Sequence, residues 1–258
     1  MSLSLDAAAH VRIFTLTCEV PFAGHPNVGT AFVLGHLPTW FGALVGDDTL
    51  RLEERVGIVE VSLLRDEESN AVTVATIRAP GPLTTGSYMP LELVARCISV
   101  ATSQIKITTY APVIASVGLA FALAELNDLE ALGQARPYVS VFHDANAIYH
   151  DQDAEFPLFL YVRDKEDPVK IRASMFAPLD DVTEDPATGS ASAALGAFLV
   201  SGLEEQNVTV QATIEQGVEM GTRSVIRLEV RKEEGEVKDV FVTGCCVRVM
   251  KGTVEVCD

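Results

Sequence analysis

The sequence predicts an α+β fold built from two strand-rich halves, each with one strongly apolar helix. Segments such as 56–64 and 71–77 alternate β-branched and polar residues, which is typical of half-buried strands. Two other segments, one near the start of the chain and one near residue 185, share the order strand, turn, apolar helix. With 258 residues, the chain is long enough for one large or two ordinary domains.

The first of these segments runs over residues 19–31. A strand expected over 11–16 leads into a turn of proline and small residues. His25 and Pro26 follow where an apolar helix begins, and we expect this helix to end at about Leu37. His25 is therefore a polar group at the entrance of a helix.

The second segment places two acidic residues before Pro186, and a small-residue turn then opens an apolar helix. Proline lacks an N–H group and has a fixed φ, which suits the entry to a turn or helix. Gly189 lets a ligand approach the backbone. Thr188, Ser190 and the free N–H groups of the first helical turn form an expected site for an anion such as a carboxylate. Asp185 stands beside this site, where it can move or orient a proton.

Together the two segments resemble the PhzF-like proteins, a family named for an isomerase of phenazine biosynthesis. The resemblance rests on Pro21-Phe22-Ala23-Gly24-His25-Pro26 and on Glu184-Asp185-Pro186-Ala187-Thr188-Gly189-Ser190-Ala191, in this order and at this spacing. Shorter matches at Arg12-Ile13-Phe14, Ser116-Val117-Gly118-Leu119 and Met175-Phe176-Ala177-Pro178 extend it over nearly all of residues 11–258.

The resemblance implies a fold like that of diaminopimelate epimerase. In that fold each of two domains wraps a barrel-like, mostly antiparallel sheet around a central helix, and the site lies in the cleft between the domains. We place the domains at 1–108 and 109–249, and we expect the last strand, 250–258, to return to the first domain.

The implied activity is a proton shift on a small carboxylate-bearing substrate, with no metal and no organic cofactor. By position, the family's catalytic histidine and aspartate match His25 and Asp185, and its serine matches Ser190. The backbone at Gly24 and Gly189 is expected to bind the substrate carboxylate, with Thr188 and Ser190 beside it.

The family's catalytic glutamate has no counterpart that we can find. It lies in a strand–helix segment before the strand that carries Arg12, and about ten residues precede that strand here, with Asp6 as their one acid. Glu19 matches a different glutamate of the family. We therefore expect the segment to be missing and the proton shift to be weak or absent. We also expect the exposed sheet edge to pair with a second chain, as a homodimer, or to be covered by residues 1–10.

Composition argues against several partners and locations. The 36 acidic and 19 basic residues give a net charge of −17, whereas nucleic acids and anionic membranes attract basic patches. No apolar run is long enough to span a membrane, and the start of the chain lacks the pattern of a signal peptide. Five cysteines without a C-x-x-C pair favour a reduced, cytoplasmic location. Neither helix entrance holds a cysteine, which argues against two-cysteine epimerase chemistry, and the histidines lack metal-ligand spacing.

The remaining elements follow from periodicity and turn residues. Helices are expected over 90–100 and 128–132, with Asn127 as the N-cap of the second. Strands are expected over 105–123 with a break at Gly118, and over 138–142, 158–162, 169–173, 208–214, 224–230, 237–249 and 253–256.

Alternative interpretations stay open at this point. His25 and Asp185 can simply hydrogen-bond their own turns, and Ser190 can serve as a helix-start hydroxyl. Besides an isomerase, the chain can be a non-catalytic protein that binds a small molecule in the same cleft. A third hypothesis is an epimerase in which Asp185 and His25 are the two bases.

Overall fold

The computed structural model describes residues 7–15, 19–37, 39–40, 43–44, 48–150 and 155–253. Its α-helices are α1 (Gly24–Gly35), α2 (Leu91–Cys97), α3 (Leu129–Gln134), α4 (Val139–Tyr149) and α5 (Gly189–Ser201). Its strands are β1 (Ala9–His10), β2 (Ile13–Phe14), β3 (Glu19–Val20), β4 (Thr39–Trp40), β5 (Ala43–Leu44), β6 (Thr49–Glu54), β7 (Gly57–Arg65), β8 (Val72–Arg78), β9 (Thr84–Tyr88), β10 (Val113–Ser116), β11 (Ala120–Glu125), β12 (Leu158–Arg163), β13 (Lys170–Ala177), β14 (Val182–Asp185), β15 (Val208–Gln216), β16 (Ser224–Glu233) and β17 (Glu236–Cys245).

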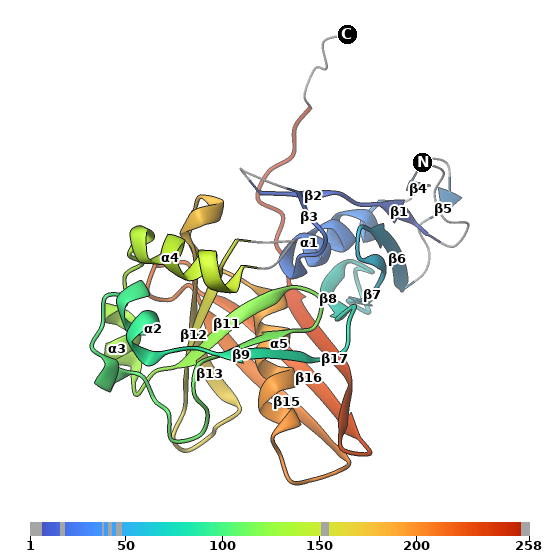
Figure 1. Ribbon diagram of the computed structural model, residues 1–258. Coiled ribbons are helices and arrows are strands. Elements are labelled where there is room, and N and C mark those ends of the chain that lie inside the picture. The colour runs from blue at the N-terminus through green and yellow to red at the C-terminus, as the bar shows by residue number, and fades with distance from the viewer. Residues whose placement is uncertain are drawn as a thin grey trace.

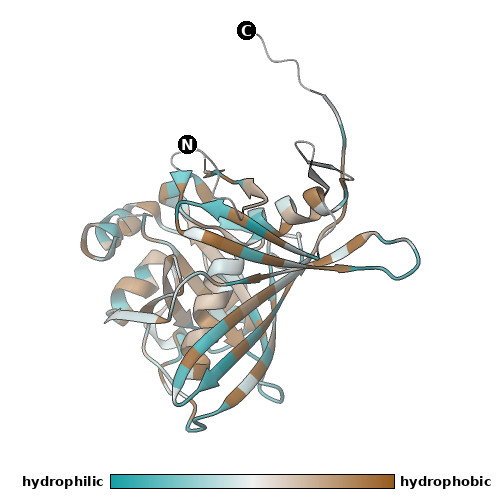
Figure 2. Cartoon of the chain, turned by 90° about the vertical axis from the view of Figure 1, so that its right-hand side faces the viewer, coloured by the Kyte–Doolittle hydropathy of each residue, from teal (hydrophilic) through white to brown (hydrophobic). Residues whose placement is uncertain are grey.

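One sheet of 13 strands links the two halves of the chain (Figure 1). Its strands follow the order β1-β6-β7-β8-β17-β16-β15-β13-β12-β11-β10-β9, and β14 pairs with β13. The pairs β1–β6, β11–β12 and β13–β15 are parallel and the others are antiparallel. Figure 2 shows hydrophilic and hydrophobic residues alternating along the strands, as expected for strands with one buried face.

Three apolar clusters form the core. One lies around α1 and the inward residues of β6, β7 and β8, and a second surrounds α5 inside β10 to β17. The third lies on the other face of the sheet, under α2, α3 and α4. Almost every residue of α5 is buried, which is typical of a central helix. The predicted α+β fold, with curved sheets wrapped around two apolar helices, is confirmed.

The two central helices meet at their first residues. A Cβ atom built on Gly24 would lie 2.9 Å from the Cα atom of Gly189 and 3.1 Å from the backbone nitrogen of Ser190. A Cβ atom on Gly189 would lie 3.3 Å from the Cα atom of Gly24. Because backbone packs directly on backbone, the N-termini of α1 and α5 converge at one place.

Both central helices, and most of the other elements, were predicted in place. The helix expected over 90–100 is α2, and the strands expected at 158–162, 169–173, 208–214 and 224–230 are present. Ala9 and His10 form β1 alongside β6. The predicted pairing or covering of the edge left by a missing segment stays a prediction. Of the expected last strand, residues 250–253 are not in a strand and 254–258 lie outside the described residues. The domain boundary near residue 108 stays a prediction.

The strand expected over 105–123 is present only at 113–116 and 120–125, and the one expected over 237–249 ends at Cys245. Two further local predictions were wrong. The strand expected over 138–142 is the start of α4, because Val141, Phe142 and Ala145 repeat at helical spacing and face the third cluster. Asn127 is not the N-cap of α3. Asp128 takes that place, since its carboxylate accepts a hydrogen bond from the N–H of Ala131 at 2.9 Å.

We predict that Glu125→Gln lowers the free energy of unfolding by about 1–3 kcal/mol. The Glu125 carboxylate, 1% exposed, accepts hydrogen bonds from Lys106 Nζ at 2.8 Å and from Arg163 Nη2 at 2.8 Å. Both cations are partly exposed and can reach water after the change, which limits the loss. Urea unfolding of this variant is to be compared with that of Asp144→Asn, which breaks an exposed pair with Arg96 and should change nothing measurable. If both variants lost the same free energy of unfolding, the buried hydrogen bonds of Glu125 would not stabilise the fold as we predict.

We also predict that Gly24→Ala destabilises the protein by about 1–3 kcal/mol, because the added methyl group meets backbone atoms that have no rotamer to change. Gly29 lies in the same helix and has nothing within 4 Å of its would-be Cβ atom. Gly29→Ala should therefore be neutral, or stabilising by up to about 1 kcal/mol. Thermal unfolding of the two variants tests the contact, and a Gly24→Ala protein as stable as Gly29→Ala would rule it out.

Candidate functional site

The two sequence segments singled out above lie on either side of the contact between α1 and α5. In each half a short strand, β3 or β14, ends in a turn that opens the central helix. When the helix-start residues Gly24 and Gly189 are aligned, Pro21 and Pro186 coincide, and His25 stands opposite Ser190. We call these two places the α1 entrance (residues 20–27) and the α5 entrance (residues 185–192).

Neither helix is capped by the side chain of its N-cap residue. The N-cap of α1 is Ala23 and that of α5 is Thr188, and neither side chain makes a cap hydrogen bond. The first N–H groups of a helix have no partner within the helix, and the helix dipole makes this end positive. Two such ends converging at Gly24 and Gly189 can bind one small anion between them.

A cluster of hydrogen bonds holds the α5 entrance. The hydroxyl of Thr188 donates to Asp185 Oδ2 at 2.6 Å. Gln216, fully buried at the end of β15, donates through Nε2 to the carbonyl oxygen of Asp185 at 2.6 Å and to Thr188 Oγ1 at 2.9 Å. Its Oε1 accepts from the backbone N–H of Thr188 at 2.9 Å. The amide of Gln216 therefore fixes the turn that carries the Asp185 carboxylate.

The structure brings most of the predicted site residues together. Gly24, Gly189 and Ser190 lie within a few ångströms of one another through their backbones, and Ser190 is buried. His25 is exposed at the α1 entrance, and Asp185 is half-buried at the α5 entrance. The hydroxyl and N–H groups of Thr188 are both occupied within the turn, so this residue supports the entrance from behind.

Sequence reasoning missed three buried polar residues near the entrances: Asn27, Glu54 and Gln216. Asn27 is polar among the apolar positions of α1, and Gln216 precedes Gly217, whose φ of +73° marks a tight turn. Both features were visible in the sequence. Glu54 carried no such signal, because an acid at a strand end is normally exposed.

Two carboxyl groups next to the entrances have altered proton affinity. Burial raises the pKa of Glu54 to about 7, and the nearby amide of Asn27 opposes this in part. Burial also raises the pKa of Glu184, the neighbour of Asp185, against a hydrogen bond with Ser174. Acids with raised pKa values are common where proteins transfer protons.

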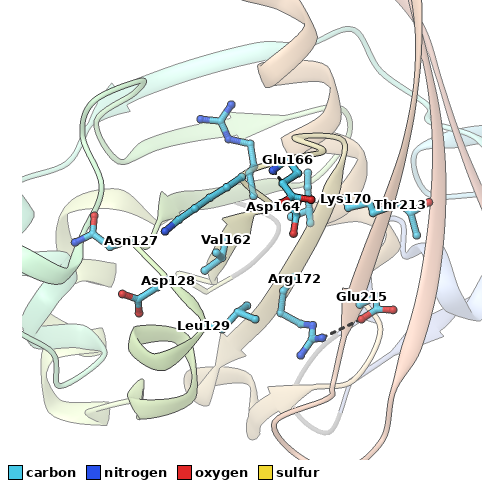
Figure 3. Close-up of a pocket in the computed structure, with 13 residues that line it drawn as sticks. Asn127, Asp128, Leu129, Val162, Asp164, Glu166, Lys170, Arg172, Thr213 and Glu215 are labelled. Atoms are coloured by element: carbon cyan, nitrogen blue, oxygen red, sulfur yellow. Dashed lines mark hydrogen bonds and ion pairs between the residues drawn. The ribbon is translucent and has the colours of Figure 1, made fainter.

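A cavity of about 570 Å³ lies elsewhere, between α3 and the outer face of β12, β13 and β15 (Figure 3). None of its lining residues belongs to an entrance. Its arginines are neutralised, because Arg172 pairs with Glu215 at 3.0 Å and Arg163 pairs with Glu125. We therefore do not place the site in this cavity.

Within residues 7–150 and 155–253, apart from the short gaps given above, no three histidine, cysteine, aspartate or glutamate side chains are grouped to hold a metal ion. In the same part of the chain, no helix has the length and apolar character needed to cross a membrane.

Comparison with known proteins agrees with the resemblance seen in the sequence. The model of the phenazine biosynthesis-like protein family matches residues 2–252. The trans-2,3-dihydro-3-hydroxyanthranilate isomerase of Pseudomonas fluorescens is 33% identical over 248 residues, covering 95% of this chain and 79% of the isomerase. An uncharacterized isomerase of Mesorhizobium japonicum is 29% identical over 245 residues, covering 94% and 78%.

Solved structures share the fold. A phenazine biosynthesis protein of the PhzF family from Bacillus anthracis superimposes with a TM-score of 0.77 at 20% identity, covering 96% of this chain and 80% of the other. A hydroxyproline epimerase from Agrobacterium vitis gives 0.59 at 14% identity, with 94% and 69% covered. At such identities these structures show the fold alone. Because the family model spans nearly the whole chain, the protein belongs to the phenazine biosynthesis-like (PhzF) family.

Proposed function

We propose that this protein is a cofactor-independent isomerase that shifts a proton on a small carboxylate-bearing substrate. The observation that carries the proposal is the meeting of two uncapped helix entrances at Gly24 and Gly189. Relatives named as trans-2,3-dihydro-3-hydroxyanthranilate isomerases are 31–33% identical to this chain, which supports the same class of reaction here.

The substrate carboxylate would be bound by the first N–H groups of α1 and α5, with the Ser190 hydroxyl as a further donor. Binding the carboxylate would place the rest of the molecule over the two entrances. There Asp185, oriented through Thr188 and Gln216, would take a proton from carbon. It would act in place of the family's glutamate, for which we find no counterpart in this sequence, so we expect slow turnover. His25 on the opposite entrance would orient the proton or deliver it.

The reaction is balanced without any redox partner. A proton leaves a carbon next to a carbonyl or conjugated group, the electron pair moves along the conjugated system, and a proton returns at another carbon. The closed contact of the two helices keeps the donors fixed in place, so they need no reorganisation as charge develops on the substrate.

A second candidate is an epimerase with Asp185 and His25 as the two bases. It is favoured by their origin on different entrances, since inversion at one carbon needs acid and base groups on opposite faces of the substrate. A homodimer and a cytoplasmic location stay predictions from the sequence.

We predict that Asp185→Asn lowers turnover by about 10²–10⁴-fold, because the amide keeps the shape but does not accept a proton. The assay follows deuterium incorporation from heavy water into trans-2,3-dihydro-3-hydroxyanthranilate. Asp181→Asn is the matched control. Asp181 is exposed and has φ +58°, a conformation that asparagine tolerates, so turnover should be unchanged.

The outcomes separate the candidates. Deuterium at a new carbon together with a shifted double bond supports the isomerase. Deuterium at the original carbon with inverted configuration supports the epimerase. Substrate binding without exchange would overturn both and leave a binding protein, and equal turnover of Asp185→Asn and Asp181→Asn would remove Asp185 from the chemistry.

A further inference from the structure

Glu54 and Asn27 form a buried polar pair behind the α1 entrance. Glu54 is 6% exposed and Asn27 is 0% exposed, and neither carboxylate oxygen of Glu54 nor either amide atom of Asn27 has a hydrogen-bond partner. Asn27 lies in the first turn of α1, three residues after Gly24. Asn27 is near enough to Glu54 to lower its pKa, which burial raises, although no hydrogen bond joins the two side chains.

Glu54 occupies in the first half the place that Gln216 occupies in the second. Each is the last residue of the first strand of the large sheet that follows its central helix, β6 after α1 and β15 after α5. Each strand then turns back as an antiparallel hairpin, β6–β7 or β15–β16. Both residues are buried; Gln216 hydrogen-bonds the α5 entrance, and Glu54 lies near Asn27 of the first turn of α1.

If Glu54 plays the part that Gln216 plays in the second half, its carboxyl group must be neutral. Gln216 supports its entrance with one acceptor, Oε1, and one donor, Nε2. A neutral carboxylic acid offers the same set, one carbonyl oxygen and one O–H group, whereas a carboxylate offers acceptors only. Asn27, which carries both an acceptor and two donors, can pair fully with the neutral acid.

The charged groups around Glu54 do not neutralise it. Glu53 lies on the other face of the same strand, and Arg55, in the turn after it, donates to the carbonyl oxygen of Glu19 at 3.0 Å. Glu19 itself is paired with Arg12. In β7, Glu54 pairs with Gly57 and the inward side chains beyond it are apolar. The histidines of β1 and α1, His10 and His25, are exposed. Among the described residues, none forms an ion pair with Glu54.

We infer that Glu54 is the positioning residue of the α1 entrance, and that the entrance accepts an anion only while Glu54 is neutral. The second part rests on the proposed function. An ionised Glu54 would put a buried negative charge behind the first turn of α1, where it would cancel the positive end of the helix and repel a bound carboxylate. Anion binding is then coupled to uptake of one proton at Glu54.

The protonation of Glu54 also gives a stability signature. Its folded pKa, about 7, lies above the usual 4.5, so its stabilising contribution is complete below 4.5 and is lost as the pH rises through 7. The Glu54→Gln variant keeps the neutral hydrogen-bonding pattern at every pH. Relative to this variant, the folding equilibrium constant of the wild type should fall by about thirtyfold between pH 5.5 and 8. Starting at pH 5.5 avoids the isoelectric point near 4.6.

The test combines urea unfolding at several pH values with calorimetry of benzoate binding near pH 7.5, in two buffers of different ionisation enthalpy. Wild type should take up as much as about 0.8 of a proton per benzoate bound, and Glu54→Gln should take up none. Glu60→Gln makes the same change at an exposed position of the same hairpin and should behave like wild type. Gln216→Glu should bring the same pH dependence to the second half.

Each outcome decides the inference. Identical pH profiles for wild type and Glu54→Gln would overturn it, as would a Glu54→Gln protein that fails to fold, because the amide matches the neutral acid. Proton uptake that persists in Glu54→Gln would assign the coupling to another group and overturn the inference. If benzoate binds to no variant, the anion site and the proposed function fail, and the unfolding curves alone decide whether Glu54 is neutral.

Discussion

The contact between Gly24 and Gly189 is the constraint on which the rest of the site depends. Backbone meets backbone there, so the first turns of α1 and α5 come closer than any side chain would permit. Both helices are buried in apolar clusters that fix their axes, and β17 pairs with β8 to join the two wrapping sheets. The position of the two positive helix ends is thus set by the packing of the whole molecule.

The two halves use one plan with different side chains. In the second half, Gln216 supplies a permanently neutral donor and acceptor to the turn before α5. In the first half, Glu54 ends the equivalent strand, and its hydrogen-bonding capacity depends on a proton. On the inference drawn above, an entrance with a fixed amide and an entrance with a titratable acid would give the site one rigid side and one side that responds to pH.

The sequence predicted the large features because they rest on local patterns. The prolines, glycines and apolar runs near residues 25 and 189 were enough to predict both central helices and their entrances. Residues 138–142 were predicted as a strand because Val, Phe and Tyr favour strands, but packing against the third cluster makes them the start of helix α4. Gln216 lies 27 residues after Gly189 and Glu54 lies 30 residues after Gly24, and only the folded sheet shows which turn each supports.

The most direct test of the account is a crystal structure with a small carboxylate such as benzoate at saturating concentration. The account predicts carboxylate oxygens about 2.7–3.2 Å from first-turn N–H groups of both helices, one at Gly24–His25 and one at Gly189–Ser190. A carboxylate held by one helix alone, or bound instead in the cavity beside Arg163 and Arg172, would contradict the claim that the two entrances form one anion site.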